Sequence, residues 1–376
     1  MKIVFTGGGT GGHFYPIIAI AQRVNQIVSK EKILQVKLYY ISDSPYDKAA
    51  LFENSLIYEE VNAGKLRTYF SIKNFFDVFK TILGILKAII KLYLIYPDVV
   101  FGKGGYASFP TLFAARLLRI PVIIHDSDSA PGRVNQWAGK FAKKIAISFP
   151  EAGSYFPKEK TAWTGQPIRL EIEKPAPKDE SLRYWKLESS LPVIFIIGGS
   201  QGAELINSVI LDALPRLLEN FQIIHQTGVL NFKMVSERAS IVLANNPNKS
   251  RYQTIDFLNP LQLKTAAGAA SIIISRAGSG LFEIAGWGVP SILIPFTNSN
   301  EDHAKKNAFN YARAGACSVI EEMNMTANIM IAEIDRIMED KMTYARMSQS
   351  AKNFNKIGAA EKIAQALIDI ALGHEE

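Results

Sequence analysis

Two glycine-rich turns contain the residues whose types and spacing point most directly to chemistry. The first covers residues 7–13 (Gly-Gly-Gly-Thr-Gly-Gly-His) and the second covers residues 198–203 (Gly-Gly-Ser-Gln-Gly-Ala); each follows an apolar run and precedes a helical pattern. The exposed backbone N–H groups of such a turn, with the positive end of the following helix dipole, suit phosphate. Two anion sites in one chain predict two phosphorylated ligands, which is the arrangement of a group-transfer enzyme.

A dinucleotide-binding dehydrogenase is an alternative for the first turn. Gly7, Gly9 and Gly12 fit the dinucleotide fingerprint, with Asp43 near the end of the next strand as a ribose ligand. Asp43 lies rather far downstream, however, and a dehydrogenase would not need the second turn. Binding of NADH against UDP separates the two interpretations.

Short apolar runs alternate with longer helical patterns in both halves of the chain, which predicts two parallel, doubly wound sheets. A stretch rich in Pro, Glu and Lys at 167–179 is typical of a linker. In such sheets ligands bind beyond the carboxyl ends of the strands, where the glycine turns lie. The predicted strands are 2–6, 37–41, 99–101, 121–125 and 144–147 in the first half, and 192–197, 222–225, 271–275, 291–295 and 317–320 in the second.

Composition limits the class of protein and its partners. The chain has 376 residues, enough for two domains, and a formal net charge of +7, which favours acidic partners without choosing among nucleic acid, anionic membrane and phosphorylated substrates. Its single cysteine, Cys317, excludes an internal disulfide and a cysteine-built metal site within one chain. The start of the chain lacks the pattern of a signal peptide, so we expect a cytoplasmic location.

The segment 73–91 has a helical stripe of polar or small residues and a wide apolar arc. Its lysines and its aspartate would be too costly near the middle of a membrane span, so we predict no span there. Two interpretations remain: a core helix with a lysine face, or an interfacial helix whose apolar residues enter lipid while its lysines meet anionic headgroups. Both can hold, on different sides of one helix. The membrane-contacting residues would be Phe75, Phe79, Lys80, Ile82, Leu86 and Lys87.

The chain closely resembles the MurG family of bacterial peptidoglycan glycosyltransferases. The resemblance runs in family order over nearly the full length, which makes it specific even though each glycine motif alone is weak. The residues that carry it are 7–13, 102–106, 125–128, 131–132, Asn135, 165–169, 198–203, 276–279, Glu283 and 288–290.

The resemblance implies a GT-B fold, with two Rossmann-like domains facing across a cleft. Residues 1–167 would form the acceptor and membrane-associating domain, 168–354 the UDP-sugar domain, and a C-terminal helix within 355–376 would pack back on the first. The implied activity is inverting transfer of N-acetylglucosamine from UDP-GlcNAc to lipid I, giving lipid II. This places the protein in peptidoglycan and cell-wall synthesis, and hence in cell shape and division, peripherally at the cytoplasmic face of the membrane, with no nucleic-acid partner.

Inverting transfer needs a base near the attacking hydroxyl and stabilisation of the leaving diphosphate. His13 is the expected base, because a helix N-terminus disfavours imidazolium and keeps the ring able to accept a proton. Asp126 and Asp128 remain alternative bases. A histidine that only caps the turn or holds phosphate is the structural alternative.

The resemblance also implies the ligand contacts. Glu283 would accept both ribose hydroxyls, Arg169 would lie near the donor diphosphate, and the backbone of Leu258 would read the uracil. The turn at 102–106 would help to bind the acceptor diphosphate, with Lys103 adding charge. The full donor set is Thr10, Gly11, Gly12, Asp128, Arg169, Ser200, Gln201, Leu258, Ser279, Gly280 and Glu283, and the acceptor set is Gly104, Gly105, Tyr106 and Asn135.

Two departures from the family pattern affect donor-sugar contacts. Asp128 stands where the family often has asparagine, so it can accept from sugar hydroxyls but cannot donate, and Ala304 removes a glutamine side chain. Asp126 and Asp128 also form the Asp-x-Asp pattern of metal-dependent glycosyltransferases, but those enzymes have a different fold, so we expect neither a metal nor another cofactor.

Three other functions are weighed. A glycolipid synthase or a UDP-sugar epimerase of the same GT-B class is the nearest, distinguished by product analysis. A membrane-docked, nucleotide-sensing scaffold would bind UDP-GlcNAc without turnover and would be unaffected by His13→Ala. It ranks low because the whole motif set is present.

Overall fold

The computed structural model describes residues 1–65, 72–198, 203–296 and 303–373. For residues 72–74 it describes the backbone only. The chain divides into two compact units, one of Met1–Arg169 with Lys356–Glu376 and the other of Leu170–Asn355. The change of unit therefore falls two residues after the sequence-predicted boundary and inside the 167–179 stretch that was predicted to be a linker.

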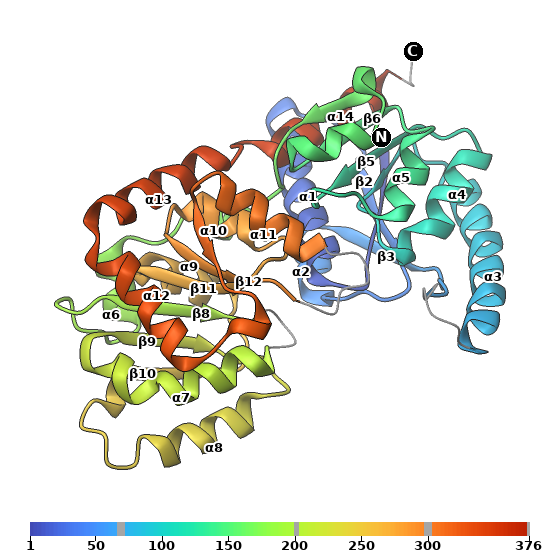
Figure 1. The fold of residues 1–376 in the computed structure, drawn as a ribbon. Helices are drawn as coiled ribbons and strands as arrows, with labels where there is room; N and C mark the ends of the chain where they lie inside the picture. The colour runs from blue at the N-terminus through green and yellow to red at the C-terminus, as the bar shows by residue number, and fades with distance from the viewer. Residues whose placement is uncertain (66–71, 199–202, 297–302, 374–376) are drawn as a thin grey trace. The chain divides into compact units, whose positions relative to one another are not determined.

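Unit 1 contains a seven-stranded parallel sheet in the order β3-β2-β1-β4-β5-β6-β7 (Figure 1). The order reverses direction between β1 and β4, which makes the sheet doubly wound. Its strands are β1 Lys2–Thr6, β2 Lys37–Ser42, β3 Leu56–Glu60, β4 Val99–Gly102, β5 Val122–Asp126, β6 Lys144–Ile147 and β7 Thr161–Trp163.

Side-chain alternation along these strands builds a core on each face of the sheet. Phe5 points into a cluster with α1 (Gly11–Glu31) and α14 (Ala359–Leu372), whereas its neighbour Val4 points into a second cluster on the other face. The helices α1 and α14 lie side by side although they come from opposite ends of the chain (Figure 1). The other helices are α2 Lys48–Glu53, α3 Ile72–Ile95, α4 Phe109–Leu117 and α5 Arg133–Gly139.

Unit 2 contains a six-stranded parallel sheet in the order β10-β9-β8-β11-β12-β13, which reverses between β8 and β11. Both units are doubly wound, so the predicted class of two Rossmann-like domains is confirmed. The strands are β8 Val193–Ile197, β9 Gln222–Gln226, β10 Tyr252–Ile255, β11 Ile272–Arg276, β12 Ser291–Ile294 and β13 Cys317–Val319.

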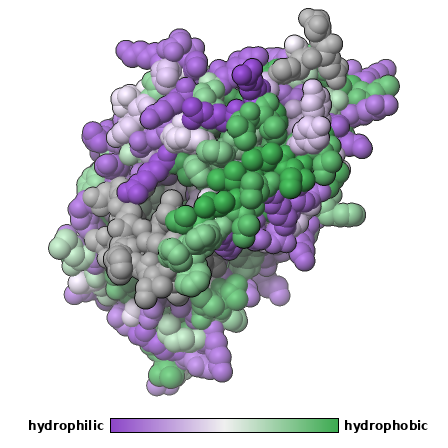
Figure 2. Space-filling model, turned by 90° about the vertical axis from the view of Figure 1, so that its right-hand side faces the viewer, coloured by the Kyte–Doolittle hydropathy of each residue, from purple (hydrophilic) through white to green (hydrophobic). Residues whose placement is uncertain are grey.

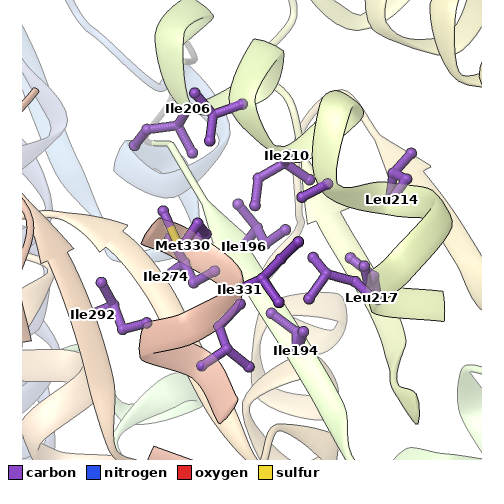
Figure 3. Close-up of a cluster of buried hydrophobic side chains, with 14 of the residues drawn as sticks. Ile194, Ile196, Ile206, Ile210, Leu214, Leu217, Ile274, Ile292, Met330 and Ile331 are labelled. Carbon is purple, nitrogen blue, oxygen red and sulfur yellow. The ribbon is translucent and has the colours of Figure 1, made fainter. Parts of the chain in front are cut away.

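Isoleucines dominate the core on one face of the second sheet. Ile194, Ile274 and Ile292 come from three adjacent strands and meet Ile210 of α7 and Met330 of α12 (Figure 3). This burial fixes the strand ends that carry the second glycine turn. The helices of unit 2 are α6 Lys178–Tyr184, α7 Glu204–Asn220, α8 Phe232–Val242, α9 Pro260–Ala269, α10 Leu281–Trp287, α11 His303–Arg313, α12 Ala327–Glu339 and α13 Lys341–Phe354.

Every strand predicted from the sequence is present, with bounds within one residue. Three strands were missed: β3, β7 and β10. All three lie at a sheet edge, where one side has no neighbouring strand and the apolar run that reveals an inner strand is short or interrupted.

Candidate active site

The sequence-predicted site residues gather where the strand order reverses. In unit 1 the first glycine turn follows β1 and the 102–106 turn follows β4, and these are the two strands between which the order changes direction. In unit 2 the second glycine turn follows β8 and Gly278, Ser279 and Gly280 follow β11, again at the reversal. In open α/β sheets ligands bind at such a point, so this edge of each unit is the candidate binding site.

The two turns of unit 1 are in direct contact, which explains their glycines. A Cβ on Gly7 would lie 2.9 Å from Cβ of Lys103, too close for any other residue. Gly105 has a φ of +77° and would point a Cβ at the His13 ring, 3.5 Å away. The backbones of the two turns therefore approach each other only because these positions carry no side chain.

His13 lies in the first turn of α1 and is held by its neighbour in the turn. Its Nδ1 is hydrogen-bonded to Oγ1 of Thr10 at 2.9 Å, and no partner for Nε2 occurs in the described part of the chain. Burial and, to a smaller extent, the Lys103 ammonium lower the pKa of His13 to about 4, while Asp128 opposes the shift. The ring is therefore neutral, as predicted, but through burial and a buried cation.

The two aspartates differ in environment. Asp126 is buried, its Oδ2 accepts from Nδ2 of Asn135 at 2.8 Å, and its Oδ1 accepts from the backbone N–H of Asp128 at 2.8 Å. Burial and the neighbouring Asp128 raise the pKa of Asp126 to about 6, against the effects of Lys103, Asn135 and the Asp128 amide. Asp128 is only half-buried. A carboxylate already bonded on both oxygens is poorly placed to take a further proton from substrate, so Asp128 is the more accessible of the two.

Asn135, predicted to contact the acceptor, is 3% exposed and directs its amide inward. Its Nδ2 also donates to the backbone oxygen of His125 at 3.0 Å. The structure thus uses its donors to hold the end of β5.

A buried polar network below these groups was not anticipated from the sequence. Lys103 is 2% exposed and its Nζ donates to Oγ of Ser127 at 2.7 Å. Ser127 and Ser148 both donate to Oε1 of Gln166, at 2.7 Å and 2.8 Å, and Nε2 of His125 lies 3.2 Å from Oγ of Ser148. Lys103 therefore points into the protein and donates to Ser127, and the expected contribution of its charge to acceptor binding stays a prediction. The network forms because residues at or just after the ends of four neighbouring strands come together at one edge of the sheet. The sequence alone does not show that these strand ends are neighbours.

Arg169 ends unit 1 with its guanidinium over the ring of Tyr15, 3.9 Å from the centroid. This stacking fixes a cation beside α1, the helix that the first glycine turn opens. Tyr106 donates from its hydroxyl to Oδ2 of Asp43 at 2.7 Å. Asp43, the ribose ligand of the dehydrogenase alternative, thus already accepts a protein hydrogen bond.

In unit 2 three of the predicted nucleotide contacts, Ser279, Gly280 and Glu283, lie at the N-terminus of α10. Gly280 is the N-cap residue, and Glu283 lies in the first turn of the helix, where its carboxylate is half-buried. Apart from their chain neighbours, no atom of the described residues lies within 4 Å of a Cβ built on Gly278 or Gly280, so the described part of the chain leaves this side of the turn open. Leu258 is 5% exposed in the loop after β10. Ser200 and Gln201 lie outside the described residues.

Two further groups stabilise this edge of unit 2. Arg276 pairs with Glu322 at 2.6 Å and its guanidinium lies 5.4 Å from the Phe296 ring centroid. His225 is hydrogen-bonded through Nε2 to Oδ1 of Asn207 at 3.0 Å and through Nδ1 to the Tyr252 hydroxyl at 2.8 Å. Burial lowers the pKa of His225 to about 3, so the ring links three elements as a neutral group.

The helix α3 has one side packed against the protein and one side exposed to solvent. One side faces the protein at close range: a Cβ on Gly84 would clash with the backbone oxygen of Asn62, and Ala88 and Leu92 are fully buried. The bulky residues point outward, and Figure 2 shows them as an apolar band on this face. The two interpretations therefore apply to different sides of the helix: one side packs into the core, and the other presents apolar residues and lysines to solvent. The exposed apolar residues of the helix include Phe75 64%, Phe76 67%, Phe79 53%, Ile82 49%, Leu83 66%, Leu86 54% and Ile90 60%.

Lys80 and Lys87 are exposed on the same helix, while Lys91 pairs with Glu59. Among the described residues, no helix is both long and apolar enough to cross a bilayer. The same residues contain no cluster of three or more His, Cys, Asp or Glu side chains placed to hold a metal ion.

The fold and the paired switch-point sites define an α/β enzyme of the GT-B class. Residues 3–147 match the glycosyltransferase family 28 N-terminal domain, and residues 193–364 match the glycosyltransferase family 28 C-terminal domain. The chain belongs to glycosyltransferase family 28.

Individual relatives agree with this assignment. The UDP-N-acetylglucosamine--N-acetylmuramyl-(pentapeptide) pyrophosphoryl-undecaprenol N-acetylglucosamine transferase 3 of Bacillus thuringiensis is 33% identical over 364 residues, which cover 96% of this chain and 97% of the relative. The crystal structure of Acinetobacter baumannii MurG has a TM-score of 0.73 at 23% identity, covering 98% of this chain and 99% of that one. A UDP-GlcNAc 2-epimerase from Neisseria meningitidis bound to UDP-GlcNAc has a TM-score of 0.67 at 15% identity, covering 98% and 100%. At these identities the structures share the fold alone.

Proposed function

We propose that the protein transfers N-acetylglucosamine from UDP-GlcNAc to N-acetylmuramyl-(pentapeptide) pyrophosphoryl-undecaprenol, lipid I, and so makes lipid II for peptidoglycan. The observation that carries the proposal is the match to a transferase named for this reaction along almost the whole of both chains. Two switch-point sites, one in each unit, support a reaction between two phosphorylated ligands rather than the chemistry of one cofactor.

In the proposed reaction a hydroxyl oxygen of the acceptor sugar attacks the anomeric carbon of the donor. The new C–O bond forms as the bond to the UDP oxygen breaks, which inverts the configuration, and the hydroxyl proton passes to a base. His13 is the proposed base, since its neutral ring has Nδ1 held by Thr10 and Nε2 available. Asp128 is the competing base, and His13→Gln and Asp128→Asn separate the two.

We assign the donor to unit 2 and the acceptor to unit 1. Ser279, Gly280 and the carboxylate of Glu283 would hold the UDP, with the first-turn amides of α10 available to an anion. Gly104, Gly105 and Tyr106 would meet the acceptor diphosphate near the start of α1, whose N-cap Thr10 makes no side-chain cap. No metal enters this scheme, because helix N-termini and Arg169 supply the positive charge.

Peripheral binding at the cytoplasmic face of the membrane is the second part of the proposal. The apolar residues of α3 project to solvent beside Lys80 and Lys87, which is the composition of an interfacial helix that favours anionic lipid. Contact through this face would bring a lipid-linked acceptor to unit 1 without a spanning helix.

Purified protein incubated with labelled UDP-GlcNAc and a short-chain lipid I analogue tests the function. The expected result is a disaccharide product and UDP in equal amounts. Turnover of a different acceptor would remove the lipid I assignment. With UDP-GlcNAc alone, a product epimerised at C2 would favour the epimerase, and binding without turnover would favour the scaffold.

A further inference from the structure

Asp43 was singled out by the dinucleotide motif, but the proposed function gives it no role. It directly follows β2 and is half-buried. Its Oδ2 accepts a hydrogen bond from the hydroxyl of Tyr106 at 2.7 Å, and its Oδ1 accepts from Oγ of Ser42 at 3.3 Å. Both carboxylate oxygens are thus bonded to protein groups, which favours a role in holding the structure of the site.

The hydrogen bond between Asp43 and Tyr106 spans the end of β1. The strand order places β2 on one side of β1 and β4 on the other. Asp43 follows β2, Tyr106 lies in the turn after β4, and the first glycine turn follows β1. The bond therefore joins the two neighbours of β1 across the strand end from which the glycine turn leaves. Burial and the bond to Asp43 raise the pKa of Tyr106 to about 12, so the hydroxyl keeps the proton that it donates.

Side chains from both neighbours of β1 close on the first glycine turn. On the β2 side, a Cβ on Gly8 would clash with Oγ of Ser42, the residue next to Asp43. On the β4 side, a Cβ on Gly9 would lie 3.0 Å from Cε1 of Tyr106. These two glycines are therefore required by contacts with protein side chains, and the contacts come from the same two segments that the Asp43–Tyr106 bond joins.

Tyr46 adds a third contact from the loop after β2. Its φ is +51°, which a residue with a side chain adopts only where its surroundings fix it. Its ring centroid lies 5.1 Å from that of Phe14 and 5.8 Å from that of Tyr15, and its hydroxyl would lie 2.8 Å from a Cβ on Gly11. The loop that carries Asp43 is thus packed against the start of α1 at a second point.

We propose that Asp43 is a positioning residue for the acceptor: by accepting the Tyr106 hydroxyl it ties the loop after β2 to the turn after β4, and so fixes the first glycine turn against Gly105. The inference rests on the proposed function, because that function assigns these turns to the acceptor diphosphate. Asp43 touches no substrate in this account. It limits how far the two turns can separate, so that their backbone N–H groups keep one arrangement.

The test is a double-mutant cycle of Asp43→Ala and Tyr106→Phe, read as the KM for a short-chain lipid I analogue at saturating UDP-GlcNAc. Each single change removes the same hydrogen bond, so each should raise this KM about tenfold, in line with the worth of a hydrogen bond to a charged group. The double variant should also lose about tenfold, because the bond can be lost only once. Both kcat and the KM for UDP-GlcNAc should stay within about twofold, since the donor is assigned to unit 2.

Two variants serve as controls. Asp43→Asn keeps an oxygen that can accept from Tyr106, so its KM for the analogue should stay within about threefold of the wild-type value. Tyr344→Phe makes the same chemical change in unit 2, where the Tyr344 hydroxyl donates to the backbone oxygen of Ser271 at 3.0 Å, and should leave this KM unchanged. A role in folding alone would lower kcat with the fraction of folded protein and leave the KM of the folded enzyme in place.

Calorimetric binding of the analogue without UDP-GlcNAc separates this inference from the proposed function. The Kd should rise about tenfold in Asp43→Ala and in Tyr106→Phe. Wild-type protein that binds the analogue, loses affinity in both variants and forms no disaccharide would remove the proposed function and leave the positioning role. Wild-type protein that does not bind the analogue would overturn both.

Folded single variants with an unchanged Kd, or a double variant in which the two losses multiply, would overturn the inference alone. If Asp43→Ala does not fold, Tyr106→Phe and Asp43→Asn decide. A loss in the first with none in the second supports the positioning role, and equal values for the two variants contradict it.

Discussion

Replacing Phe75 and Phe79 with serine tests whether α3 binds membranes. The two rings are 64% and 53% exposed, so together they offer a little more than one full phenylalanine side chain to lipid. Burying such a side chain is worth about 2 kcal/mol, and each 1.4 kcal/mol is tenfold in affinity. We therefore expect Phe75→Ser/Phe79→Ser to bind vesicles about 50-fold more weakly than the wild type, without a change in thermal stability.

The assay is sedimentation with vesicles of phosphatidylcholine containing phosphatidylglycerol. Leu34→Ser/Phe52→Ser is the matched control, because both residues are more than four-fifths exposed in unit 1 but lie outside α3. Lys80→Gln/Lys87→Gln should weaken binding about 30-fold on anionic vesicles, at about 1 kcal/mol per lysine, and leave binding to neutral vesicles unchanged. Binding of the serine double variant within threefold of the wild type, or an equal loss in the control, would refute the reasoning.

Three further predictions concern catalysis, packing and metal. His13→Gln should lower kcat of the transfer about 10²- to 10⁴-fold with little change in KM, and a loss below tenfold would return the base to Asp128. Gly84→Ala should lower the free energy of unfolding by about 1 to 3 kcal/mol, since its Cβ would clash with the Asn62 oxygen; a urea melt with Lys87→Ala as control measures this, and an unchanged midpoint would contradict the packing of α3. Excess EDTA should leave the transfer rate unchanged, whereas complete loss restored by Mg²⁺ or Mn²⁺ would make Asp126 and Asp128 candidate ligands.

The sequence predicted best those elements whose formation depends on one local property, such as a continuous apolar run. Apolar runs located the inner strands of both sheets, and α14 at Ala359–Leu372 lies within the 355–376 segment where a C-terminal helix was expected. Edge strands such as β7 carry no such run because one side of the strand has no partner. The periodicity of α3 showed which residues share a face of the helix but not which face packs against the protein. The packed face is the one that carries Gly84, because a residue without a side chain lets the backbone of Asn62 approach.

In the candidate site, too, the features that depend on local residue type were predicted and those that depend on tertiary contacts were not. Glycine turns after strands marked both switch points, because the need for close backbone approach is local and visible in residue type. The neutral state of His13 was predicted from the helix dipole, but its cause is burial and Lys103. That cause depends on which strand ends lie together in the folded sheet. The spacing of residues along the sequence indicates neither the burial of Lys103 nor its hydrogen bond to Ser127.

A crystal grown with UDP tests most directly the claim that each unit holds its own phosphorylated ligand. We predict the diphosphate at the start of α10 in unit 2, with the ribose hydroxyls on the carboxylate of Glu283. UDP bound instead at the first glycine turn of unit 1, with the start of α10 empty, would contradict the assignment of donor and acceptor sites.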